Sequence, residues 1–201
     1  MGRTVPKVSK IVWESGALTA PVPPVMVSCG TMENSNIITI AWTGIICTKP
    51  SRTYVSIRPT RHSYDIIKES GELVINLTTK ELVRAADWCG VYTGAKVDKF
   101  AACSLTKEPA SKVSCPMIAE SPLNIECRVF DIIPLGTHDM FLCDVEAVNV
   151  DDSLFDEAGK LHIERASLAA YAHGDYYDLG QKLGSFGFAV RKNKRKKTPK
   201  K

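Results

Sequence analysis

Two neighbouring segments of the sequence carry side chains that could hold a flat ring and an anion. Residues 36–44 combine β-branched residues with amide, hydroxyl and indole groups, and residues 58–64 place two arginines beside two aliphatic hydroxyl groups. Strand side chains alternate with period two, which predicts two faces in the first segment. Asn36, Ile38, Ile40 and Trp42 would share one face, and Ile37, Thr39, Ala41 and Thr43 would share the other.

The second segment leads into a helix that we expect to begin near Ser63. The unpaired N–H groups and the positive dipole end of such a helix would add to the charges of Arg58 and Arg61, so an anion fits there. A flat heteroaromatic ring that carries a phosphate tail, such as a flavin, would use both segments.

The composition predicts a folded body with a basic end. The chain has 201 residues, of which 44% are hydrophobic and 24% charged, enough for one domain with extensions. Residues 191–201 hold eight Lys and Arg residues and no acid, whereas the whole chain has a net charge of only +4, so the rest is mildly acidic. A mildly acidic body argues against a nucleic-acid-binding domain. The tail could bind polyanions, but it lacks an aromatic residue for base stacking and is interpreted as a disordered, solubilising end.

The cysteine pattern favours reduced thiols in the cytoplasm. There are seven cysteines, an odd number, with no C-x-x-C pair and no pattern typical of a secretory leader. We interpret them as small buried hydrophobes, because zinc and iron–sulfur sites bring their ligands in close pairs. No apolar run approaches the roughly 20 residues of a membrane span, which predicts a soluble protein.

The order of elements predicts an antiparallel β-barrel with short helical insertions, because no strand–long helix–strand alternation is present. Residues 1–23 are expected to form an extended arm, 24–190 the domain, and 191–201 the basic tail. Strands are predicted at residues 25–29, 36–42, 54–57 and 72–77, and helices at 63–70 and 79–89, ended by Gly71 and Gly90. A long ribbon is predicted from residues 124–133 and 139–150, joined across Gly136.

An ordered set of motifs resembles the flavin reductase-like FMN-binding proteins with a split β-barrel fold, within them the flavoredoxin-type branch. The similarity runs from about residue 24 to residue 191. Its signs are Asn36-x-x-Thr39-x-x-Trp42, Arg58-Pro-x-Arg-x-Ser63-Tyr64, residues 70–77, Cys89-Gly90, Asp98-Lys99-Phe100, Cys115-Pro116, Gly136-Thr-His138 and the glycine- and tyrosine-bearing residues 176–187. Because no dinucleotide-binding or P-loop glycine motif is present, FMN is the expected flavin.

The resemblance implies a cofactor site and an activity. It places Asn36, Thr39, Ala41, Trp42 and Thr43 at the isoalloxazine ring, and Thr60, Ser63 and Lys99 at the phosphate, with Arg58 and Arg61 as nearby cations and His138 and Tyr171 as further neighbours. It also implies a homodimer with FMN near the subunit interface. Such proteins transfer a hydride from NADH or NADPH to flavin, or pass electrons onward, and the cofactor performs the chemistry.

Several of these residues have a plain structural interpretation as well. Trp42 could belong to the barrel core, Ser63 could only cap its helix, and Lys99 could be a solvated charge beside Asp98. His138 lies in a predicted hairpin turn, where a histidine is usually exposed.

No catalytic side chain is predicted. Glu72 and Asp98 are not placed by the sequence at one reacting atom, and Ser28, Ser63 and His62 match no known arrangement of a nucleophile and its base. The leading hypothesis is an FMN-dependent oxidoreductase of the NAD(P)H:flavin reductase type. An electron carrier that accepts electrons from a redox protein partner, and a non-catalytic flavin-binding module, are the alternatives.

Overall fold

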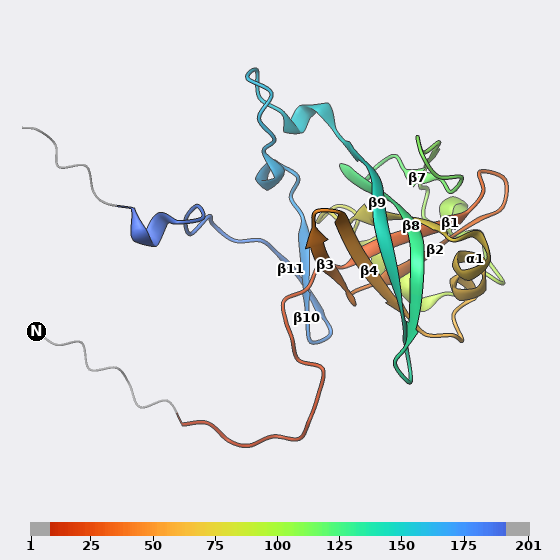
Figure 1. Ribbon diagram of the computed structural model, residues 1–201, viewed down its shortest axis with the longest axis horizontal. Coiled ribbons are helices and arrows are strands. Elements are labelled where there is room, and N and C mark those ends of the chain that lie inside the picture. Colours follow the sequence, from red (N-terminus) through yellow and green to blue (C-terminus); the bar gives the residue numbers. More distant parts are fainter. Residues whose placement is uncertain (1–8, 192–201) are drawn as a thin grey trace, which may run out of the picture.

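A computed structural model describes residues 9–191, and its largest feature is one antiparallel sheet accompanied by a few short helices (Figure 1). The strands are β1 (Val25–Gly30), β2 (Ser35–Ile40), β3 (Thr43–Thr48), β4 (Ser51–Ile57), β5 (Glu72–Leu77), β6 (Lys107–Glu108), β7 (Met117–Ile118), β8 (Leu123–Pro134), β9 (Asp139–Val150), β10 (Ala169–Ala172) and β11 (Asp175–Asp178). The helices are α1 (His62–Ser70), α2 (Val83–Val91) and α3 (Lys99–Ala102), with short 3₁₀ turns at η1 (Asp152–Leu154), η2 (Ile163–Arg165) and η3 (Phe188–Val190).

The main sheet is a barrel that remains open along one seam. Its seven strands follow the order β2-β1-β5-β8-β9-β4-β3, so β2 and β3 are the two edges. The chain passes directly from one edge to the other through Ala41 and Trp42, which brings the two edges together at that end. The edge strands β2 and β3 are not hydrogen-bonded to each other, and the barrel is therefore split, as the sequence predicted.

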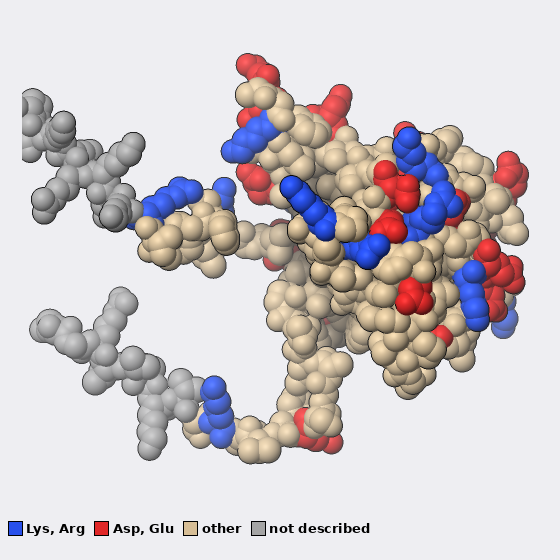
Figure 2. Space-filling view, in the orientation of Figure 1, with Lys and Arg blue, Asp and Glu red and all other residues tan. Residues whose placement is uncertain are grey.

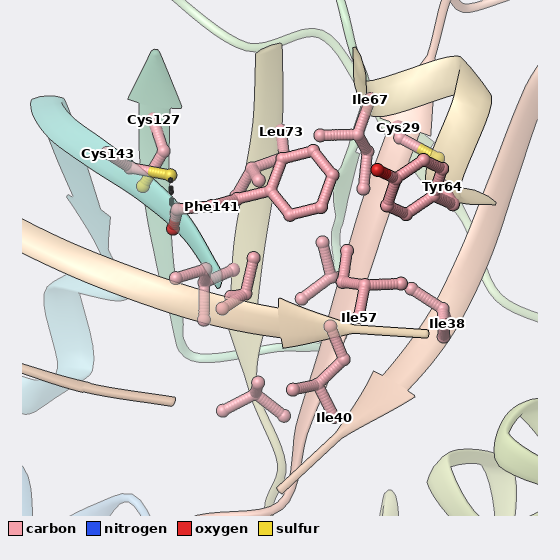
Figure 3. Packing of buried hydrophobic residues seen from close by; sticks show 14 residues of the cluster. Cys29, Ile38, Ile40, Ile57, Tyr64, Ile67, Leu73, Cys127, Phe141 and Cys143 are labelled. Atoms are coloured by element: carbon pink, nitrogen blue, oxygen red, sulfur yellow. Dashed lines mark hydrogen bonds between the residues drawn. The ribbon is translucent and has the colours of Figure 1, made fainter. Parts of the chain in front are cut away.

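Apolar side chains fill the barrel interior (Figure 3). Phe141 of β9 is fully buried and meets the ring of Tyr64 of α1 edge-on, with ring centroids 5.3 Å apart. Ile57, Ile67 and Leu73 close around them. Burying a side chain as large as Phe141 contributes about 2–3 kcal/mol to folding, and this packing fixes α1 against the sheet at the end of the seam.

Helices α2 and α3 cover the outer face of β1 and β2. Their Ala86 and Phe100 pack with Met26 and Ile37, whereas Ile38 faces the barrel interior. The period-two alternation predicted for this strand is confirmed up to Ile40, where the strand ends. The prediction that it continues to Trp42 was wrong, because Ala41 and Trp42 form the bend that carries the chain to β3.

The two predicted helices differ in how well their ends were placed. Helix α1 ends at Gly71, whose left-handed backbone (φ 68°) caps it as predicted. Helix α2 begins at Val83 instead of Thr79, because Thr79 forms a separate turn in which its side chain accepts from the Leu82 amide. Gly90 was predicted to end this helix, but it lies inside the helix, where a Cβ would come within 3.3 Å of Thr39. The glycine permits close packing of α2 on β2.

The remaining segments lie beside the barrel. The long β8–β9 ribbon, the turn at Gly136 (φ 100°) and the strands near residues 25–29, 54–57 and 72–77 agree with the prediction. Residues 9–20 form no regular structure, and the part before residue 17 extends away from the sheet (Figure 1). Val22 pairs with Tyr171 of β10. The predicted basic tail lies, apart from Arg191, outside the described residues.

Candidate functional site

The site is built along the open edge of β2. The carbonyl of Ile37 points out from this edge, because it accepts a hydrogen bond from the side chain of Lys99 and not from a strand. Alternate residues of an antiparallel strand direct their backbone groups to the same side, so Thr39 presents its N–H and C=O to the same open edge. These groups are available to a planar ligand that lies along the seam.

A small polar pocket lies at the beginning of β2. Its volume is about 100 Å³, and it brings together five of the residues predicted to bind the cofactor. These are Asn36, Thr60, Arg61, Ser63 and Lys99. They come from β2, from the turn before α1, from α1 itself and from α3, so the pocket joins segments that are far apart in the sequence.

Asn36 and Ser63 are hydrogen-bonded to each other on one wall of this polar pocket. The amide nitrogen of Asn36 donates to Oγ of Ser63 at 2.7 Å, and both side chains are buried. Gly94 lies so close that a Cβ there would approach Oδ1 of Asn36 to 2.0 Å. The interpretation of Ser63 as a simple helix cap was wrong, because Arg61 is the N-cap residue of α1 and no side chain caps that helix. The amide of Tyr64 donates to the carbonyl of Arg61, so the N–H groups of His62 and Ser63 are the ones that remain available at the pocket.

Lys99 brings a buried positive charge to the polar pocket. Only 4% of the residue is exposed, and its ammonium donates to the carbonyls of Ile37 and Cys89, each at 2.7 Å. An ammonium group has three donors, so one is left over for a further acceptor. Burial lowers the pKa of Lys99, with a smaller contribution from Arg61. A bound anion would offset both effects.

The interpretation of Lys99 as a solvated charge beside Asp98 was therefore wrong. Asp98 instead caps α3, because its carboxylate accepts from the amides of Phe100 and Ala101.

A larger, mainly apolar cavity lies at the other end of β2. Its volume is about 520 Å³, and four further predicted residues line it, namely Ala41, Trp42, Thr43 and Tyr171. Trp42 is 47% exposed, so the interpretation that it belongs to the barrel core was wrong. Its position follows from the bend between the two edge strands, which turns the indole outward.

Three predicted residues line neither pocket. The hydroxyl of Thr39 donates to the carbonyl of Ala86 on α2, so its side chain holds that helix while its backbone faces the seam. His138 stacks on Trp42 with centroids 6.3 Å apart and planes 5° apart. Arg58 lies 3.4 Å from His138, measured from Nε to Nε2. Partial burial, with Arg58 and Arg61 nearby, lowers the pKa of His138, which favours the neutral form of the imidazole beside the indole.

The sequence did not identify some residues of the large cavity. Tyr54, His173 and residues 17–20 of the N-terminal arm contribute to its walls. The arm and His173 lie near the barrel because Val22 and Tyr171 pair as neighbouring strands, each donating its amide to the other's carbonyl. No local sequence motif predicts this pairing, because it depends on contacts between segments that are distant in the sequence.

The two pockets are spaced for an elongated ligand. Asn36 borders the polar pocket and Ala41 borders the large cavity. The extended strand from Asn36 to Ile40 spans about 14 Å, and Ala41 follows it in the bend. A ligand with an anionic end and a flat apolar end could therefore lie along the seam with one end in each pocket.

The acidic residues considered as catalysts have structural roles. Glu72 accepts from the amide of Ser114 and pairs with Arg128, and Asp98 caps α3. Within residues 9–191, His, Cys, Asp and Glu side chains form no cluster of three that could hold a metal ion. In the same part of the chain, no helix is long and apolar enough to cross a membrane.

The chain belongs to the family described as the flavin reductase like domain, whose model matches residues 17–180. The matched region includes the barrel, both pockets and the β10–β11 hairpin. The resemblance expressed by the sequence motifs is thereby confirmed at the level of the family.

Among solved structures, the flavoredoxin of Desulfovibrio vulgaris (Miyazaki F) is 30% identical, has a TM-score of 0.84, and is matched over 91% of this chain and 100% of its own. The flavoredoxin from Methanosarcina acetivorans shares the fold, with a TM-score of 0.80 at 22% identity over 92% of this chain and 100% of that one. An uncharacterized protein of Archaeoglobus fulgidus is 33% identical over 125 residues, which cover 62% of this chain and 71% of the relative.

Proposed function

We propose that this protein binds FMN along the seam of its barrel and acts as an oxidoreductase of the NAD(P)H-dependent flavin reductase type. The observation that carries this proposal is the pairing of a polar, cationic pocket with a large apolar cavity at the two ends of one open strand edge. The family and the similarity to a flavoredoxin support the choice of a flavin as the ligand.

The residues present fit the phosphate end of FMN. Ser63 and Thr60 supply hydroxyl groups, and the remaining ammonium donor of Lys99 supplies a charge-assisted hydrogen bond. The uncapped first turn of α1 adds backbone N–H groups and the positive end of the helix dipole. Arg61 adds a second positive charge at the mouth of the pocket.

The large cavity fits the ring end. Its walls are mainly apolar and include Trp42, Tyr54 and Tyr171, which offer aromatic surface to a flat heterocycle. The outward N–H and C=O of Thr39 can meet the polar atoms of a ring that lies along the strand edge. The electronic properties of such a ring depend on these backbone contacts.

When bound, FMN supplies the capacity to accept and donate a hydride. The chain's own residues bind the cofactor, orient it and exclude water, because within residues 9–191 no acid–base pair or nucleophile borders either pocket in a catalytic arrangement. Residues 17–20 of the arm form one wall of the large cavity and leave a nicotinamide only the remaining open side for face-to-face approach.

An electron carrier that receives electrons from a redox protein is the second candidate, favoured by the similarity to a flavoredoxin. Anaerobic addition of NADH or NADPH to the yellow protein separates the two functions. Bleaching of the flavin absorbance by a nicotinamide supports the reductase. Bleaching by a reduced ferredoxin-type protein alone supports the carrier. Release of no flavin from purified protein, together with no uptake of added FMN, contradicts both.

We further propose that the protein is a homodimer. Apolar side chains are exposed on the edge strand β3, where Ile45 is 83% exposed, on the arm at Trp13, and near the C-terminal end at Leu183 and Phe186. Exposed apolar groups of this number on one side of a barrel are typical of an interface. Light scattering should give twice the mass of the chain, and a monomer mass at micromolar concentration would refute the dimer.

A cytoplasmic location is also proposed, supported by seven cysteines that all carry free thiols in the structure. Fractionation of cells that produce the protein would test this location.

The charge distribution of the folded body gives no support to nucleic-acid binding. Acidic and basic side chains are interspersed over the face shown in Figure 2. Arg52 pairs with Asp144, and Arg128 pairs with Glu72.

A further inference from the structure

Two cysteines from different helices lie side by side next to the polar pocket. Sγ of Cys89 on α2 is 3.8 Å from Sγ of Cys103, the residue that ends α3. Cys89 is buried and lines the pocket, whereas Cys103 is partly exposed. The pair therefore combines a thiol that a small oxidant can reach with a buried thiol close enough to react next.

We propose that Cys89 and Cys103 form a dithiol that hydrogen peroxide converts to a disulfide, and that this conversion weakens binding at the polar pocket. The formation of the disulfide depends only on the two cysteines. The weakening of binding rests on the proposed FMN site.

The chemistry requires two successive displacements. The sulfur of Cys103 attacks one peroxide oxygen, the O–O bond breaks, and hydroxide leaves and takes up the thiol proton as water, which gives a sulfenic acid. The sulfur of Cys89 then attacks the oxidised sulfur, the S–S bond forms, the S–O bond breaks, and a second water leaves with the Cys89 proton. The two sulfurs lose two electrons, and hydrogen peroxide gains them. Cys103 reacts first because it is partly exposed, whereas Cys89 is buried, and this burial, with Cys103 nearby, raises the pKa of Cys89 to about 12.

The geometry links this oxidation to the polar pocket through Lys99. The S–S bond requires the two sulfurs to approach from 3.8 Å to about 2.0 Å, and this approach of roughly 1.8 Å pulls the backbones that carry the two cysteines, in α2 and at the end of α3, toward each other. The carbonyl of Cys89 holds the ammonium of Lys99 at 2.7 Å, and Lys99 is the first residue of α3. Movement of either helix end therefore shifts the ammonium relative to Ser63 and Arg61.

The other described cysteines lack this combination of proximity and access. Cys127 and Cys143 interact across the ribbon but are buried in the barrel core, as Figure 3 shows. Cys47 is partly exposed, and its thiol donates to the carbonyl of Lys49. Cys47 is therefore a matched control, because it is accessible to the oxidant and no other thiol is bonded to it in the described structure.

The disulfide can be measured without reference to any cofactor. The full-length protein is treated with hydrogen peroxide, alkylated and digested with trypsin without reduction. Mass spectrometry should find peptide 85–96 joined to peptide 100–107 with the loss of two hydrogens, in the wild type and in Cys47→Ser. Cys103→Ser should yield no such pair. Separate, alkylated peptides from wild-type protein whose Cys47 is already oxidised would overturn the proposal.

The coupling is measured on the same samples by titrating flavin-free protein with FMN before and after oxidation. The oxidised wild type should bind FMN about tenfold more weakly, the equivalent of one hydrogen bond to a charged group, and dithiothreitol should restore the affinity. Oxidised Cys103→Ser should keep its affinity. A disulfide-linked protein that binds FMN as tightly as the reduced one would overturn the coupling. Absence of binding in the reduced protein would instead refute the proposed function, and the peptide measurement would still decide whether the disulfide forms.

Discussion

Replacing Thr60 and Ser63 together with alanine should remove much of the affinity for FMN while leaving the affinity for riboflavin unchanged. Both hydroxyl groups line the polar pocket, and riboflavin lacks the phosphate that we place there. A hydrogen bond to a charged group contributes about 1.5–3 kcal/mol. Ser63 is buried but Thr60 is exposed, so the pair should contribute about 3 kcal/mol, which corresponds to a roughly hundredfold weaker Kd.

The double substitution also affects folding, and this effect can be separated from binding. Loss of the Ser63 hydroxyl leaves the amide of Asn36 without its acceptor, at a cost of about 1 kcal/mol in stability. Thermal unfolding is measured first to show that the variant folds. Thr48→Ala with Ser51→Ala is a matched control, since both residues are exposed at the ends of β3 and β4, away from the pockets.

Calorimetric titration of flavin-free protein with FMN and with riboflavin decides the outcome. We expect the FMN affinity to fall roughly hundredfold toward that of riboflavin in the Thr60/Ser63 variant, because Lys99 and Arg61 remain, and to stay at the wild-type value in the control. Wild-type FMN affinity in a folded variant would refute the phosphate site. Equal losses for FMN and riboflavin would show that these hydroxyl groups act on the ring and not on the phosphate.

Three further substitutions test other parts of the structure. Trp42→Ala should weaken both FMN and riboflavin by about tenfold in titration, because it removes an aromatic wall of the ring cavity; an unchanged riboflavin Kd would refute that role. Gly94→Ala should weaken FMN binding because its Cβ displaces Asn36, whereas Gly180→Ala, which meets no atom within 4 Å, should not. His162 pairs with Asp156 and Glu164, which raise its pKa. Hydrogen-exchange protection of the residue 156–164 loop should therefore be full below the ordinary histidine pKa and fall as pH rises through the raised value, and pH-independent protection would contradict it.

The sequence predicted those parts of the fold that depend on local patterns. Alternation along residues 36–40, the glycine cap of α1 and the long ribbon around Gly136 are each specified by neighbouring residues. The strand β3 was missed, because its exposed Ile45 and Ile46 interrupt the alternation expected of a half-buried strand. The N-terminal end of α2 was placed too early, because a threonine that forms a turn resembles one that caps a helix.

The candidate site was predictable in its residue types but not in its geometry. The sequence indicated that hydroxyl groups and cations lie near the beginning of α1, and the structure brings Ser63 together with Lys99 and Asn36 in one pocket. That Lys99 is buried and bonded to two carbonyls follows from the packing of α3 against β2, which no local pattern encodes. The contribution of the arm to the large cavity likewise depends on a long-range pair between Val22 and Tyr171.

We propose, above all, that the seam of the barrel holds FMN with its phosphate beside Ser63 and Lys99. The most direct measurement is a ³¹P NMR titration of flavin-free protein with FMN, repeated with Lys99→Met. We expect a saturable shift of the phosphate resonance in the wild type, and weaker binding with a smaller shift in the folded variant. A wild-type protein that leaves the phosphate resonance at its free position throughout the titration would contradict it.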